Sequence, residues 1–166
     1  MKATDTPGYI TVHEGGIIAP GDATGQFQAS EFTLGPNVLG VIFEEDDIFA
    51  IDLASATVSD ILAVGANNTS APTLMFEDGA IVRVNLLGGY APTADNDWLL
   101  TTGFATISGD LDNVLLQGDG GSALSDEWSL FNLNGNLLLN YAIPEPSTWA
   151  LLVIGAALTL TLRRRR

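Results

Sequence analysis

The sequence lacks cysteine, contains one histidine and is poor in basic side chains. With no cysteine among its 166 residues, it can form no disulfide, no zinc–thiolate site and no thiol nucleophile. A histidine-dependent triad or a transition-metal site would have to use His13, and no Gly-x-Ser-x-Gly motif accompanies that residue. We therefore predict no catalytic residue, no metal and no cofactor, and we interpret His13 as a surface histidine.

Basic residues are almost confined to the C-terminus. Before Arg163 the chain has only Lys2 and Arg83 against 20 acidic residues, so residues 1–162 carry a formal net charge of −18. Such a body repels nucleic acid and anionic lipid, and it offers few cations to neutralise a uronate substrate. We predict that the protein has no nucleic-acid partner and is not an enzyme. A glycosidase-type carboxylate pair stays open as an alternative, because residue spacing alone does not identify one.

Acidic residues gather in short clusters that could be surface turns or calcium ligands. The densest is Glu44-Glu45-Asp46-Asp47, and three others are Asp95-Asn96-Asp97, Asp110-Leu111-Asp112 and Asp119-Gly120-Gly121. None has the ligand order of an EF-hand, and none repeats as in a calcium-binding β-roll. We interpret them as turns and solvated surface, with calcium binding as the alternative.

What the chain has in quantity is glycine, at 18 positions, between short runs of strand-forming residues. The alternation in Ala80–Leu86 predicts a strand with Val82, Val84 and Leu86 facing inward. Asp78-Gly79 and Asn134-Gly135 are tight-turn signals. Apart from the C-terminal segment, only Ala54–Ala63 offers a helical turn. The fold class is therefore predicted to be all-β, either an antiparallel β-sandwich or a solenoid.

The order of motifs in the body favours the solenoid. Gly15, Gly16, Ala19, Pro20 and Gly21 form a Gly-Gly-x-x-Ala-Pro-Gly stretch, and strands around Phe27, Leu34 and Phe43-Glu44 follow it. The later order is Asp-x-Leu-x-Val, Leu-Leu-x-Gly-Tyr-x-Pro and a strand containing Trp98. Over residues 9–141 this resembles the C-terminal rungs of autotransporter-type right-handed β-helices. The resemblance implies a right-handed parallel β-helix, of which the chain would hold five or six rungs.

The last 25 residues, AIPEPSTWALLVIGAALTLTLRRRR, differ from the body. Residues 149–162 carry no charge, and as a helix they would rise about 21 Å, short of a hydrocarbon core of about 30 Å. The flanking Trp149 suits a membrane interface. The basic end, Arg163, Arg164, Arg165 and Arg166, can extend the span by snorkelling and stays on the cytoplasmic side. We expect a C-terminal transmembrane helix, with the acidic body outside.

A stiff connector precedes the apolar run. Pro144 and Pro146 restrict Ile143 and Glu145 to extended conformations, which suits recognition by a protease or transpeptidase. Pro144-Glu145-Pro146, the apolar run and the arginines together resemble the PEP-CTERM sorting signal. That resemblance implies a Gram-negative, usually exopolysaccharide-producing bacterium, and processing of the tail by an exosortase at or near Pro144, Glu145 and Pro146. It divides the chain into a solenoid-like extracellular domain, residues 1–141, and a sorting signal, residues 142–166.

The N-terminus, MKATDTPGYITVHEGG, has no apolar run typical of a secretory signal peptide. We hypothesise that residues 1–141 are the C-terminal portion of a longer solenoid, whose first rung would then have unpaired edges that invite association.

The function that these features predict is an exported structural or adhesive protein. It would pass through the inner membrane by residues 149–162 and end at the cell surface or in the matrix, with exopolysaccharide as a partner. One alternative is a carbohydrate-binding or carbohydrate-active protein, in which Tyr90, Trp98, Trp128 and Tyr141 would stack on sugars. Another is a tail-anchored membrane protein that is never cleaved.

Overall fold

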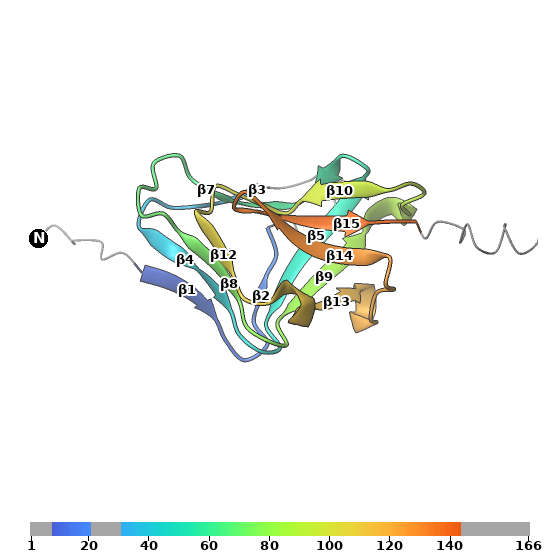
Figure 1. Cartoon of the computed structure of the whole chain (residues 1–166), viewed down its shortest axis with the longest axis horizontal. Coiled ribbons are helices and arrows are strands. Elements are labelled where there is room, and N and C mark those ends of the chain that lie inside the picture. The colour runs from blue at the N-terminus through green and yellow to red at the C-terminus, as the bar shows by residue number, and fades with distance from the viewer. Residues whose placement is uncertain (1–7, 21–30, 144–166) are drawn as a thin grey trace, which may run out of the picture.

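A computed structural model describes residues 8–20 and 31–143 (Figure 1). Its strands are β1 (Gly8–Val12), β2 (Ile17–Ile18), β3 (Glu31–Leu34), β4 (Val38–Phe43), β5 (Ile48–Ser55), β6 (Val58–Ser59), β7 (Ile61–Val64), β8 (Thr73–Phe76), β9 (Ile81–Leu86), β10 (Asn96–Leu99), β11 (Thr101–Thr102), β12 (Thr106–Ser108), β13 (Leu115–Gly118), β14 (Trp128–Leu133) and β15 (Asn136–Tyr141). Short 3₁₀ turns are η1 (Leu87–Gly89), η2 (Leu111–Asn113) and η3 (Asp119–Gly121). Within this part of the chain, no helix is long and apolar enough to cross a membrane; the helix predicted at residues 149–162 lies outside it.

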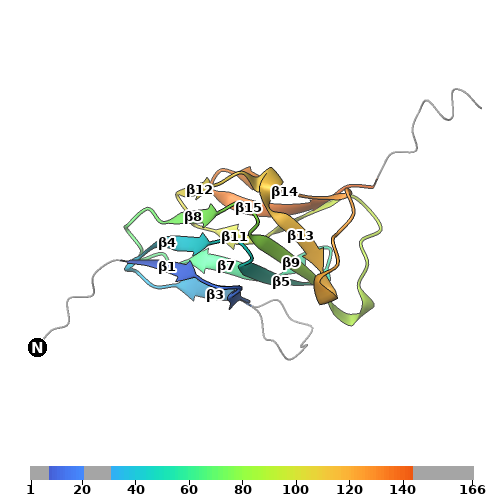
Figure 2. The same ribbon diagram turned by 90° about the horizontal axis from the view of Figure 1, so that it is seen from below.

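The strands wind into a solenoid of about three turns. Three parallel sheets form its sides, with strand orders β1-β4-β8-β12, β2-β5-β9-β13 and β3-β7-β11. Strands on one side belong to successive turns, as in the pairing of Ile48 with Ile81, 33 positions later. Figure 2 shows β1, β4, β8 and β12 following one another along the stack. This pairing confirms the solenoid and rejects the sandwich, but the turns are fewer than the five or six expected.

The core is built from identical strand positions stacked on consecutive turns. Val12 pairs with Phe43 and Phe43 with Phe76, and the two phenylalanine rings stack with centroids 5.1 Å apart. Phe49 packs against both rings from the neighbouring side. One turn alone would leave its apolar side chains exposed above and below, so the burial that stabilises each turn depends on its neighbours.

An antiparallel hairpin ends the parallel stack. Strands β14 and β15 meet at the Asn134-Gly135 turn, and β15 pairs antiparallel with β10. The Leu100 amide donates to the Leu137 carbonyl (2.9 Å), and the Leu137 amide donates to Thr101 Oγ1 (3.0 Å). The hairpin thus supplies the last turn with a strand beside β11, and its Leu137 and Leu139 are fully buried. Two strands that are adjacent in the sequence and pair antiparallel with each other therefore end the stack of parallel strands.

Of the predictions for single turns and strands, some are confirmed and others are wrong. Asp78-Gly79 and Asn134-Gly135 form turns as predicted, and Gly79 and Gly135 have positive φ. The helical turn predicted at Ala54–Ala63 is wrong: this segment contains the end of β5, all of β6 and the start of β7, because pairing between turns outweighs its weak helical pattern. In Ala80–Leu86, Val82 and Val84 are buried as expected. Leu86, at the strand's end, is partly exposed.

The first turn ends the described stack with an apolar surface. In residues 8–20 and 31–143, no strand pairs with β1, β2 or β3 on the side away from β4, β5 and β7. Ile10, Ile17, Phe32 and Leu34 line a hollow of about 290 Å³ there, and Ile17 is 57% exposed. The first described turn therefore presents apolar side chains at this end of the described stack.

Candidate functional site

The site residues predicted from the sequence lie at the C-terminus. Pro144, Glu145, Pro146, Trp149, Arg163, Arg164, Arg165 and Arg166 all fall outside the described residues, so their roles stay predictions. What the structure describes is the exit of this segment from the body, at Ala142 and Ile143 directly after β15.

Two hydrogen bonds fix the exit to the body. The Ala142 amide donates to the Glu127 carbonyl (2.9 Å), and the Ile143 amide donates to Asp95 Oδ1 (2.8 Å). Asp95 comes directly before β10, the strand that pairs with β15. Two residues along, Asp97 Oδ1 accepts a bond of 2.7 Å from Asn140 Nδ2. The predicted turn cluster Asp95-Asn96-Asp97 therefore holds the end of β15, a role that sequence reasoning missed because its partners lie more than 40 residues away.

Asp119 belongs to η3, after β13, and the other two acidic clusters, 44–47 and 110–112, line one edge of the solenoid. Consecutive turns bend there between the first two sheets, and the bends bring together a set of carboxylates that we name the acidic corner: Glu14, Glu44, Glu45, Asp46, Glu77, Asp78, Asp110 and Asp112. Stacked strands are about 4.8 Å apart, so these like charges repel one another across solvent. In the described ranges, no three Asp, Glu or His side chains form a group able to hold a metal ion.

Asp47, the last residue of the densest acidic cluster, is not part of that surface. Its side chain is fully buried and accepts two backbone hydrogen bonds, from the Gly15 amide (3.0 Å) and the Glu44 amide (2.8 Å). Gly15 belongs to the preceding turn, so one carboxylate ties two bends together. The sequence predicts a solvated face for all four residues of the cluster, and for Asp47 that prediction is wrong, because its neighbours' amides replace water as hydrogen-bond donors.

His13 lies exposed at the acidic corner. Its Nδ1 is 2.8 Å from Glu44 Oε2, and the hydrogen bond and the charge of Glu44 raise the pKa of His13 above 6.5. The prediction of a surface histidine is confirmed.

We expect the pair to stabilise the fold only in acid. A raised folded-state pKa means that the stabilisation is present below the unfolded value, near 6.5, and is lost as pH rises through the folded value. In an NMR titration of the His13 ring, Glu44→Gln should bring the pKa of His13 down towards 6.5. The matched change Glu14→Gln should lower that pKa only slightly, because the charge of Glu14 has the weakest effect on it. An unchanged pKa in Glu44→Gln would contradict the pairing.

Four aromatic side chains form one packed row under the hairpin. Tyr90 meets Trp98 edge-on, with ring centroids 6.3 Å apart. Trp98 stacks on Trp128 at a centroid distance of 5.7 Å, and Trp128 packs on Tyr141 at 4.9 Å. Trp98 is 2% exposed and its Nε1 donates to the Ser55 carbonyl (2.8 Å). Trp98 and Trp128 are buried, and Tyr90 and Tyr141 are half-buried against them, so the ring faces in contact within this row are not free to stack on a sugar.

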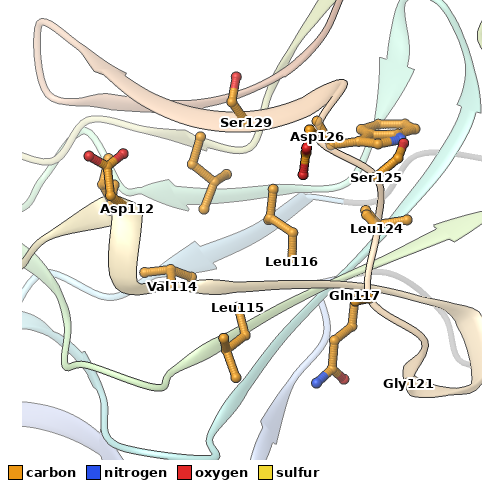
Figure 3. Close-up of a pocket in the computed structure, with 14 residues that line it drawn as sticks. Asp112, Val114, Leu115, Leu116, Gln117, Gly121, Leu124, Ser125, Asp126 and Ser129 are labelled. Carbon is orange, nitrogen blue, oxygen red and sulfur yellow. The ribbon is translucent and has the colours of Figure 1, made fainter.

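A hollow of about 420 Å³ lies between β13 and β14 (Figure 3). Leu116 and Leu124 line it, as do two carboxylates, Asp112 in η2 and Asp126 in the segment before β14. Half of its lining residues are aliphatic, and none is a histidine or a cation.

Comparison with known proteins identifies the exit segment. Residues 142–166 match the model of the PEP-CTERM protein-sorting motif. The chain has no match among curated proteins or solved structures. The matched segment begins at Ala142, one residue after β15 ends. The motif implies exosortase-dependent export and transit through the membrane of a Gram-negative bacterium.

Proposed function

We propose that this chain is an exosortase substrate whose body serves as a structural or adhesive component of the cell surface or of an exopolysaccharide matrix, without enzymatic activity. The observation that carries the proposal is the sorting motif at residues 142–166, joined without a spacer to a solenoid. Processing at or near Pro144, Glu145 and Pro146 would remove Trp149 and the four terminal arginines. The released body keeps its acidic charge, which favours solubility outside the cell.

The arrangement of the body supports a scaffold role. A solenoid presents long, regular sides whose stability is distributed over stacked turns, and such surfaces suit extended polymeric partners. The aromatic residues that would stack on sugars are packed against one another. Contacts with a polysaccharide would then be made by hydroxyl and amide groups along the sides.

The test is the fate of the tail in a host with and without an exosortase. The full chain, produced behind a secretory signal peptide in an exosortase-producing Gram-negative bacterium, should lose Arg163–Arg166 and appear outside the cell. In an exosortase-deletion strain it should keep them and stay in the membrane fraction. Replacing Pro144 and Pro146 by alanine should have the same effect in the intact host. Intact mass spectrometry separates the forms, and an unprocessed chain in the intact host would instead support the uncleaved tail anchor.

A further inference from the structure

The peptide that enters the sorting motif is held by a single side chain. Ile143, the residue before Pro144, donates its amide to Asp95 Oδ1 at 2.8 Å, and it is 43% exposed. Beside it, a hollow of about 560 Å³ is lined by Ser125, Asp126, Glu127, Ala142 and Ile143. One flank of the peptide is therefore open, and the other is attached to the body at Asp95.

The distance between this attachment and the apolar run is short. Residues 144–148 are the only ones between Ile143 and Trp149, and five residues span at most about 18 Å when fully extended. An enzyme that cleaves peptide bonds binds several extended residues on both sides of the bond it attacks. Near Pro144, the residues on the N-terminal side are Ala142 and Ile143, whose amides are already bonded to the body.

We propose that the hydrogen bond from Ile143 to Asp95 is a latch that must open before the tail is processed. The proposal rests on the proposed function, because it concerns the same exosortase reaction. Asp95 is a positioning residue: it does not touch the bond that breaks, but it sets whether the strand before that bond is free to enter the enzyme. The second attachment, at Ala142, uses the Glu127 backbone carbonyl and follows the β14–β15 ladder. Asp95 is therefore the separable element.

Two substitutions at one position distinguish the latch from a general effect. Asp95→Ala removes the acceptor, and we expect the rate of tail processing in the exosortase-producing host to rise about fivefold, the factor that one hydrogen bond of ordinary strength adds to an opening equilibrium. Asp95→Asn keeps a carbonyl oxygen at the same place and should stay within about twofold of the unmodified chain. Asp97→Ala removes the neighbouring clamp on Asn140, inside the paired strand, and should leave the rate unchanged.

The readouts are pulse-chase processing of the full chain and hydrogen exchange of the Ile143 amide in the purified protein. Faster exchange at Ile143 in Asp95→Ala, with an unchanged melting temperature and faster processing, supports the latch. Equal or slower processing in Asp95→Ala overturns it, as does an equal rise in Asp97→Ala, which would mean general loosening of β10 from β15. If the unmodified chain and all variants stay unprocessed, the proposed function itself fails and the latch fails with it.

Discussion

A Gly40→Ala chain is expected to lose more than about 3 kcal/mol of stability. Gly40 lies in the middle of β4, paired with Tyr9 on one side and Thr73 on the other. A Cβ at this position would overlap the Thr73 carbonyl oxygen and approach Tyr9 Cε1 to 2.9 Å. Backbone atoms cannot move aside without breaking the ladder between β4 and β8, so the strain is not relieved by a side-chain rotation.

The matched control is Gly35→Ala in the same turn of the solenoid. Nothing lies within 4 Å of a Cβ built on Gly35, and its φ is not in the left-handed region. The free energy of unfolding of Gly35→Ala should lie slightly above that of the original chain, by less than about 1 kcal/mol, because alanine restricts the conformations of the unfolded chain. Urea unfolding of both variants measures the difference. Similar midpoints for the two would show that the contact between β4 and β8 is looser than the structure describes.

The second large loss is expected for Asp47→Ala, at about 3 kcal/mol. Its carboxylate accepts hydrogen bonds from the Gly15 and Glu44 amides, both bonds are part-buried, and a donor left without a partner costs roughly 1–3 kcal/mol where it is shielded from water. The stability of Asp47→Asn should lie between those of the original chain and Asp47→Ala, because its amide oxygen can accept one hydrogen bond while its NH₂ group faces the other donor. Asp46→Ala is a poor control, since Asp46 has a positive φ of 65°.

Glu45→Ala provides the control for Asp47, since Glu45 is exposed in the same bend. Like Asp47→Ala it removes one carboxylate, but an exposed one, so we expect a stability change within about 0.5 kcal/mol, or a small gain from reduced repulsion. Thermal unfolding followed by circular dichroism compares the variants at one pH. An Asp47→Ala chain as stable as Glu45→Ala would mean that water satisfies the two amides and that the buried tie is unimportant.

Much of the architecture could be predicted from local pattern. Short runs of β-branched and aromatic residues between glycines indicated strands, and Asp78-Gly79 and Asn134-Gly135 indicated turns that the structure contains. The solenoid followed from the order of motifs along residues 9–141, and the parallel sheets confirm it. The expected five or six turns exceed the three observed, because one turn takes about 33 residues, as from Ile48 to Ile81, and the last strands, β14 and β15, form an antiparallel hairpin instead of a further turn.

The sequence alone identified the sorting signal, because Pro144-Glu145-Pro146, an apolar run and four arginines are contiguous and are recognisable without knowledge of the fold. Only the tertiary structure shows that Asp47 is buried while its three neighbours in the cluster face solvent. It also shows that Asp95 accepts a hydrogen bond from the Ile143 amide. In the parallel sheets of this solenoid, a residue's partner lies one turn away, from 30 positions (Gly8 to Val38) to 39 positions (Leu62 to Thr101) along the chain. Local composition fixes which residues form strands and turns, but stacking between turns decides which of many similar carboxylates is buried, paired or free.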